Sequence, residues 1–182
     1  GRRPILLTAV LSGTASEQLP VSGVVRVAVE SAVAIDEWVR QGIDRSRIEI
    51  VRPGVNLDWF ADVPAPTAER FTLLFASTPS DPREIEPRGI PLLVELARLR
   101  PEIDIVLPWR AWGNVGAARA ALDKLAPPPN FIVAIGNEPD MRRHFAACHA
   151  TICGFAAGVG KSVPNFVVEG LAAGRPAIAT AT

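Results

Sequence analysis

Short apolar runs alternate with stretches of helical periodicity over most of this chain. Between residues 71 and 180 the apolar runs are 71–76, 103–107, 130–135, 150–153 and 177–180. Between them, apolar residues recur every three or four positions in 89–100, 114–126, 139–148 and 164–173. Strands that alternate with helices at this spacing form βαβ units, in which each helix returns the chain to a parallel neighbour. The pattern therefore predicts an α/β fold built on a parallel sheet with helices on both faces.

The N-terminal part of the chain shows a shorter version of this alternation. Strand signals cover 4–10, 24–29 and 48–51. A helix is predicted over 31–41, and the proline-bearing segment 61–70 is typical of a stiff linker. We therefore expect two domains, each with its own sheet.

The composition excludes several classes of function. The 182 residues include 19 basic and 19 acidic side chains, so the net charge is zero. Nucleic-acid binding requires a basic surface, and we expect no nucleic-acid partner. No apolar run approaches the ~18 residues of a membrane span, and no signal peptide is visible. We expect a cytoplasmic protein without a transmembrane segment.

Two histidines and two cysteines are the obvious candidates for metal ligands. His144 and Cys148 are four residues apart, as are His149 and Cys153. Neither spacing is that of a zinc finger or a Cys-x-x-Cys site, and the sequence contains no Asp-x-Asp. We therefore expect no metal and no cofactor, and two cysteines exclude a disulfide framework.

The segment 158–176 combines a glycine-bearing loop, a helix start and a helix stop. Pro164 suits the first turn of a helix because its φ is fixed, and Gly174 allows the positive φ of a helix end. A helix N-terminus offers free N–H groups and the positive end of the helix dipole. Gly160 and Ser162, in the preceding loop, are therefore candidate phosphate-binding positions.

Two motifs occur in an order known from one family of enzymes. The run RPGVNLDWF covers residues 52–60, and EGLAAGRPAI covers residues 169–178. They resemble the interdomain crossing and the donor-site motif of retaining glycosyltransferases with the GT-B fold (group 1, family 4). The resemblance implies that 1–56 is the C-terminal part of the N-terminal, acceptor-side domain. It implies that 57–182 is most of the nucleotide-sugar-binding C-terminal domain, and that both domains are Rossmann-like.

The resemblance also implies an activity. The enzyme would move a sugar of the hexose type from a nucleotide-diphosphate-sugar donor to an unknown acceptor, with retention of the anomeric configuration and without a metal. On this interpretation the chain is an interior piece of a longer enzyme and is inactive by itself.

The loop after the predicted strand 71–76 corresponds to the family's diphosphate-binding loop. Arg88 and Gly89 stand where the family has a Lys-Gly pair, and Arg83 offers a second positive charge. Guanidinium groups suit diphosphate oxygens and the charge that develops on a leaving group, which makes Arg88 a catalytic candidate. The simpler interpretation is a solvated arginine pair balanced by Glu84 and Glu86.

Further donor-binding candidates follow the next two predicted strands. Arg110 comes after 103–107, where it can reach phosphate, and the neighbouring Trp109 and Trp112 can pack either on a ligand or in the core. Gly136 and Asn137 follow 130–135 and correspond to the family loop whose backbone meets the nucleotide base.

Glu169 and Lys161 complete the candidate site. The resemblance assigns Glu169 to hydrogen bonds with ribose hydroxyls, whereas a glutamate on a helix is usually solvated. Lys161 stands where the family has another glutamate; it could neutralise phosphate, contact the sugar or point to solvent, and we include it among the catalytic candidates.

Two other functions stay open. The lysine at position 161 favours a catalytically inactive nucleotide- or sugar-binding or scaffold protein with the same fold. An unrelated nucleotide-binding α/β domain has less support, because no Gly-x-Gly-x-x-Gly follows a strand.

Overall fold

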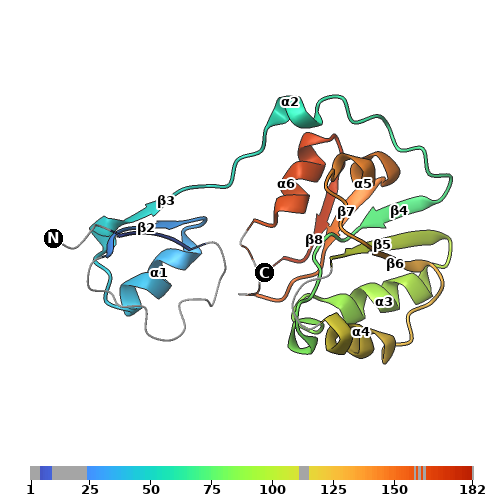
Figure 1. Cartoon of the computed structure of the whole chain (residues 1–182), viewed down its shortest axis with the longest axis horizontal. Helices are drawn as coiled ribbons and strands as arrows, with labels where there is room; N and C mark the ends of the chain where they lie inside the picture. Colours follow the sequence, from blue (N-terminus) through green and yellow to red (C-terminus); the bar gives the residue numbers. More distant parts are fainter. Residues whose placement is uncertain are drawn as a thin grey trace. The chain divides into compact units, whose positions relative to one another are not determined.

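The computed structural model describes residues 5–9, 24–110, 115–157, 159, 161 and 163–181. These residues form two compact units (Figure 1). The first contains the described residues up to Gly54, together with the described ones between 158 and 164. The second contains the remainder, from Val55 to Ala157 and from Asn165 onward.

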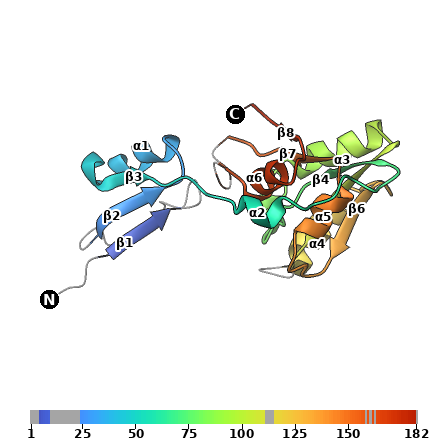
Figure 2. The same cartoon turned by 90° about the horizontal axis from the view of Figure 1, so that it is seen from above.

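The first unit is a three-stranded parallel sheet with one crossover helix (Figure 2). Its strands β1 (Ile5–Ala9), β2 (Val24–Val29) and β3 (Ile48–Ile50) lie in that order, and α1 (Val33–Arg40) connects β2 to β3. A short 3-10 helix, η1 (Arg45–Arg47), precedes β3. The buried side chains of the unit come from the sheet, from α1 and from the segment that follows α1: Val24, Val27, Val29, Ile35, Trp38, Ile43 and Ile48.

The second unit is built on a five-stranded sheet in which every pair of neighbours is parallel. Its strands are β4 (Phe71–Leu74), β5 (Ile103–Trp109), β6 (Phe131–Ile135), β7 (Ala150–Cys153) and β8 (Ala177–Ala179). They lie in the order β6-β5-β4-β7-β8. β1 and β4 therefore belong to separate sheets, as the sequence predicts.

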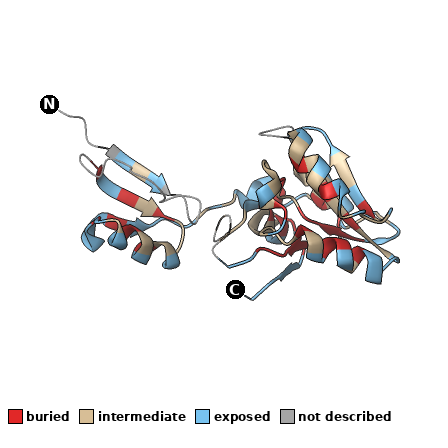
Figure 3. Cartoon of the chain, turned by 90° about the horizontal axis from the view of Figure 1, so that it is seen from below, coloured by how far each residue is buried: buried red, intermediate tan, exposed pale blue. Residues whose placement is uncertain are grey.

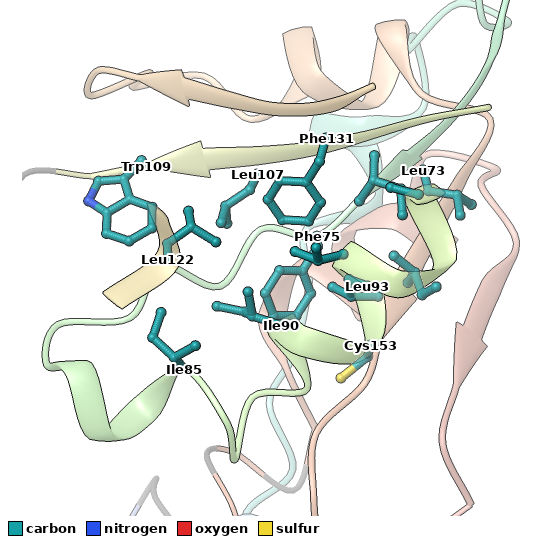
Figure 4. Close-up of a cluster of buried hydrophobic side chains, with 14 of the residues drawn as sticks. Leu73, Phe75, Ile85, Ile90, Leu93, Leu107, Trp109, Leu122, Phe131 and Cys153 are labelled. Atoms are coloured by element: carbon teal, nitrogen blue, oxygen red, sulfur yellow. The ribbon is translucent and has the colours of Figure 1, made fainter. Parts of the chain in front are cut away.

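Helices cover both faces of this sheet. They are α2 (Leu57–Phe60), η2 (Pro82–Glu84), α3 (Ile90–Leu99), α4 (Val115–Asp123), α5 (Arg142–Ala147) and α6 (Asn165–Ala172). Side chains alternate along a strand, so Leu73 and Leu74 of β4 enter two different cores. Leu73 lies with Leu93 of α3 and Leu122 of α4 (Figure 4), and the buried residues concentrate in the strands and the helix faces that cover them (Figure 3).

β5 extends two residues beyond the predicted strand 103–107, through Pro108 and Trp109. Proline interrupts a ladder because it has no N–H, but β4 already ends at Leu74. Beyond that point the hydroxyl of Thr78 donates to the carbonyl of Pro108 at 2.9 Å and accepts from the Arg110 N–H at 3.1 Å. The Thr78 side chain thus takes the place of a neighbouring strand on the side of β5 where Pro108 has no N–H to donate.

The helix α2 is absent from the sequence prediction. Its four residues are too few for a periodic signal, and two local contacts support it. The Asn56 side chain accepts from the Trp59 N–H at 3.3 Å, and Phe60 packs edge-on against Phe145 with ring centroids 5.8 Å apart. α5 is shorter than the predicted 139–148, because the Asp140 carboxylate accepts from the Arg142 N–H at the first turn.

A buried arginine joins three segments of the second unit. Arg175 is 6% exposed and donates to the carbonyl oxygens of Phe145 at 2.8 Å and Ala173 at 3.1 Å. It also donates to the carbonyl of Pro64 in the linker. Phe145 belongs to the last turn of α5, and Ala173 directly follows α6. The guanidinium therefore binds carbonyls at two helix ends, where cations are favourable.

Candidate active site

The strand order defines a topological switch point between β4 and β7. From β4 the chain proceeds to β5 on one side, and from β7 it proceeds to β8 on the other. The loops that leave the carboxyl ends of β4 and β7 therefore diverge, and in open α/β sheets ligands bind in the crevice at this point.

These two loops approach each other at a pair of glycines. Gly89 has φ +71, and a Cβ on it would lie 2.0 Å from the Gly154 carbonyl oxygen. The N–H of Ala156, in the loop after β7, donates to the carbonyl of Pro87 at 2.8 Å. The backbone that carries Arg88 is thereby fixed against the β7 loop.

Arg88 is largely buried beside this contact. Its side chain is 17% exposed, and its terminal nitrogen lies 3.0 Å from a carboxylate oxygen of Glu84. It also donates to the hydroxyl of Ser77, and its guanidinium carbon lies 5.8 Å from the centre of the Phe155 ring. A fixed guanidinium at the carboxyl ends of parallel strands is suited to bind diphosphate oxygens.

Arg83 is not brought together with Arg88. Its side chain is 89% exposed, and its Nε lies 2.8 Å from a carboxylate oxygen of Asp81. Asp81 also accepts from the Arg83 N–H at 2.9 Å and so starts the 3-10 helix η2. These hydrogen bonds hold the pKa of Asp81 below its usual range. The arrangement is a surface pair of residues two positions apart.

Arg110 lies at the carboxyl end of β5, next to the loop after β4. Its backbone N–H donates to Thr78, whose side chain is buried, while Arg110 itself is exposed. Trp109, one residue earlier, is 1% exposed and belongs to the core, so of its two possible roles the structure supports packing in the core. Trp112 lies outside the described residues.

Gly136 and Asn137 are exposed at the carboxyl end of β6, as the strand pattern requires. The Gly136 N–H donates to the carbonyl of Trp109 at 3.1 Å, which extends the pairing of β6 with β5 by one residue. Gly136 has φ +152, a value that favours glycine. Both residues therefore lie on the same edge of the sheet as Arg88, two strands away from β4.

Glu169 is half-buried on α6, which packs on β7. Phe166, Gly170 and Ala173 are buried, whereas Leu171 is 56% exposed, although its spacing along the helix is that of an apolar face. Gly170 allows the close packing, because a Cβ there would lie 2.6 Å from the Thr151 methyl group. This packing fixes the helix that carries Glu169.

Lys161 belongs to the first unit, because its contacts are with that unit. Its Nζ lies 3.4 Å from a carboxylate oxygen of Glu30, which follows β2 and has a side chain 11% exposed. The other carboxylate oxygen of Glu30 is buried without a hydrogen-bond partner among the described residues. Gly160 and Ser162 lie outside the described residues.

The histidines and cysteines are packing residues in the described part of the chain. No group of three or more His, Cys, Asp or Glu side chains there could hold a metal ion. Burial raises the pKa of Cys148 to about 11 and also raises that of Cys153. The two thiols are free and lie in different cores, Cys148 with Phe145 and Cys153 with Phe75.

A cavity of about 230 Å³ lies elsewhere in the second unit. Its lining comes from the linker and α5: Asp62, Val63, Pro64, Asp140, Arg142, Arg143 and Ala146. The Arg142–Asp140 pair, at 2.6 Å, lowers the pKa of Asp140 to about 2. Arg142 also lies over the Trp59 ring, 4.1 Å from its centre. Of the predicted site residues that the structure describes, none lines this cavity.

Comparison with solved structures identifies the class of fold. HepE from Anabaena, in complex with UDP-glucose, gives a TM-score of 0.73 at 16% identity over 98% of this chain and 53% of its own. The pneumococcal O-GlcNAc transferase GtfA, in complex with UDP and GlcNAc, gives 0.60 at 11% identity, over 97% and 37%. A glycosyltransferase from Rickettsia africae gives 0.57 at 18% identity, over 85% and 44%. No protein-family model and no curated protein sequence matches the chain.

The chain therefore has an α/β, Rossmann-like parallel-sheet fold that matches solved structures of the GT-B type. This confirms the predicted fold class. The chain spans about half the length of HepE. Among the described residues, no helix has both the length and the apolar character that a membrane crossing requires.

Proposed function

We propose that this chain is the donor-binding part of a glycosyltransferase that uses a nucleotide-diphosphate-sugar. The transfer is of the hexosyl type, retains the anomeric configuration, requires no metal and takes place in the cytoplasm. The fold supports the class of enzyme, and the two motifs at 52–60 and 169–178 support the retaining mechanism. The acceptor-side domain is represented by residues 1–56, the donor-side domain by 57–182, and the chain alone is inactive.

The observation that carries this proposal is the position of Arg88. A guanidinium that is 17% exposed, with its backbone fixed by the Gly89–Gly154 contact, lies at the switch point of a parallel sheet. When the sugar leaves, negative charge develops on the diphosphate, and an already oriented guanidinium stabilises that charge without reorganisation. Arg88 therefore acts on the leaving group rather than on the sugar.

The other predicted residues have supporting roles in this proposal. Glu169 binds the ribose hydroxyls, and the backbone at Gly136 and Asn137 meets the base. Arg83 and Arg110 are exposed and reach the donor from the surface of their loops. Lys161, with the backbone at Gly160 and Ser162, contacts the phosphates or the sugar.

Binding of nucleoside diphosphates tests the proposal directly. UDP is the first probe because the solved structures with this fold contain it. A ligand at about 100 times its Kd stabilises the folded state by about 2.7 kcal/mol, which is readily seen as a rise in Tm. GDP and ADP serve as alternatives for the base. A chain whose Tm rises with none of these would contradict the proposed function.

A second candidate function is donor binding without transfer, which the lysine at position 161 favours. Lys161 contacts Glu30, so the position holds an ion pair in place of the family's glutamate. The two functions differ in turnover. A full-length enzyme should hydrolyse a nucleotide-sugar slowly in the absence of acceptor, with no loss of rate in a chelator, whereas a binding protein should leave the donor intact.

A further inference from the structure

We propose that Glu84 is a positioning residue for Arg88, which fixes the guanidinium in its ligand-binding orientation before the donor arrives. This inference rests on the proposed function, because it assigns Arg88 to the diphosphate. It concerns a residue that sequence analysis treats only as a balancing charge.

Glu84 accepts hydrogen bonds from two sides. From one side, the Ser80 N–H donates to it at 2.8 Å and the Ser80 hydroxyl at 3.0 Å. From the other side, Nε of Arg88 donates at 3.1 Å, and a terminal nitrogen of Arg88 lies 3.0 Å away. Ser80 therefore fixes the Glu84 carboxylate to the loop, and the carboxylate in turn fixes the orientation of the Arg88 guanidinium.

The loop itself is anchored at both ends. Asp81 caps η2, whose last residue is Glu84, and the following Ile85 is buried in the core. At the far end Gly89 lies against Gly154. Glu84 and Arg88 thus project from a segment that has little freedom to move.

The contacts of Arg88 leave part of its guanidinium for a ligand. Arginine has five N–H donors. Glu84 engages Nε and one terminal nitrogen, and Ser77 engages the other terminal nitrogen. Each terminal nitrogen therefore keeps one N–H that these contacts do not use and that a diphosphate oxygen can accept.

The charge of Glu84 and its positioning role have opposite effects on diphosphate binding. As a negative charge, Glu84 repels the ligand, so a pure charge effect predicts tighter binding when it is removed. As a positioning residue, it lowers the conformational freedom that Arg88 loses on binding, so its removal predicts weaker binding. Two substitutions separate these effects. Glu84→Gln keeps an oxygen that accepts from Arg88, whereas Glu84→Ala removes both the charge and the acceptor.

The experiment measures UDP and uridine binding to the chain by calorimetry. We expect Glu84→Ala to weaken UDP binding about three- to tenfold, and Glu84→Gln to bind UDP at least as tightly as the parent chain. Uridine, which lacks phosphates, should bind all variants equally. Glu86→Ala removes the same charge from an exposed position two residues away and is the matched control. In an Arg88→Ala background, where there is no guanidinium to position, Glu84→Ala should not weaken UDP binding further.

A readout without ligand decides the positioning role separately. NMR relaxation of the Arg88 Nε–H should show a rigid group in the parent chain and in Glu84→Gln, and a mobile group in Glu84→Ala. Unchanged rigidity in Glu84→Ala, or equal losses for UDP and uridine, would overturn the role of Glu84. A parent chain that binds no nucleoside diphosphate would overturn the proposed function instead, and the NMR result would still decide whether Glu84 fixes Arg88.

Discussion

Gly89 and Gly154 lie so close that no side chain fits between the two loops at the switch point. A Cβ on Gly89 would be 2.0 Å from the carbonyl oxygen and 2.7 Å from the carbonyl carbon of Gly154. Both atoms belong to backbone, so a side chain at Gly89 cannot be accommodated by a rotamer change.

Gly89→Ala should therefore destabilise the second unit. The positive φ and the overlap together predict a loss of about 2–5 kcal/mol in the free energy of unfolding, measured with a chemical denaturant. Gly116→Ala is the control, because Gly116 lies on the exposed part of α4 with no atom within 4 Å of the added Cβ. The control should be unchanged or slightly more stable. Equal behaviour of the two variants would mean that the loops separate easily.

Arg88→Ala should weaken diphosphate binding specifically. Hydrogen bonds to charged groups contribute about 1.5–3 kcal/mol each, so the affinity for UDP should fall roughly ten- to a hundredfold by calorimetry, with uridine unaffected. Arg100→Ala removes the same charge from the opposite edge of the sheet, where Arg100 pairs with Glu102. That variant should bind UDP like the parent chain. Unchanged UDP affinity in Arg88→Ala would show that Arg88 only packs and pairs within its loop.

Glu169→Gln should distinguish ribose from deoxyribose. If Glu169 accepts from the ribose hydroxyls, the substitution should reduce affinity for UDP about ten- to a hundredfold and have a smaller effect on the 2′-deoxy analogue, which lacks one of these hydroxyls. Thermal shift titrations with both ligands measure the difference. Equal losses for the two ligands would mean that Glu169 supports α6 and does not contact the sugar.

The second unit should become less stable as the pH falls, because of the titration of His144. Burial lowers the pKa of His144, so the folded state binds a proton less readily than the unfolded chain, whose histidines titrate at about 6.5. As the pH falls below about 6.5, the unfolded state takes up more protons and the free energy of unfolding decreases. Denaturant titrations at about pH 7.5 and about pH 5 should show a smaller decrease for His144→Gln than for the parent chain. An equal decrease would assign the pH dependence to other groups.

The sequence predicts the fold because its signals are local and mutually consistent. Apolar runs of the right length identify the strands, and the helices between them require parallel pairing, so the order of elements follows. The extension of β5 could not be predicted, because Pro108 is tolerated only where Thr78 replaces the neighbouring strand. The buried face of α6 could not be predicted from apolar spacing, because Gly170, which has no side chain, lies at the closest contact.

The candidate site is predictable only in part. The resemblance supplies Arg88, and the spacing of four residues to Glu84 is a signal for an ion pair that sequence analysis can use. Arg83 forms a surface pair with Asp81 because of the local turn, and helix and strand patterns do not predict such turns. Lys161 and Glu30 are in contact although they are 131 positions apart in the sequence, and no local sequence pattern predicts a contact at such a separation.

Arg175 has a consequence for how the second unit unfolds. Its guanidinium binds the end of α5 at Phe145, the end of α6 at Ala173 and the linker at Pro64. If any of these three segments detaches, the buried Arg175 guanidinium loses a carbonyl that accepts a hydrogen bond from it. The other two contacts then hold a buried charge with one acceptor fewer, which is less favourable. Amide hydrogen exchange in α5, α6 and the linker should therefore proceed by a single shared opening event. An arginine stays charged at every accessible pH, so this cooperative unit should persist in acid that separates the carboxylate pairs around it.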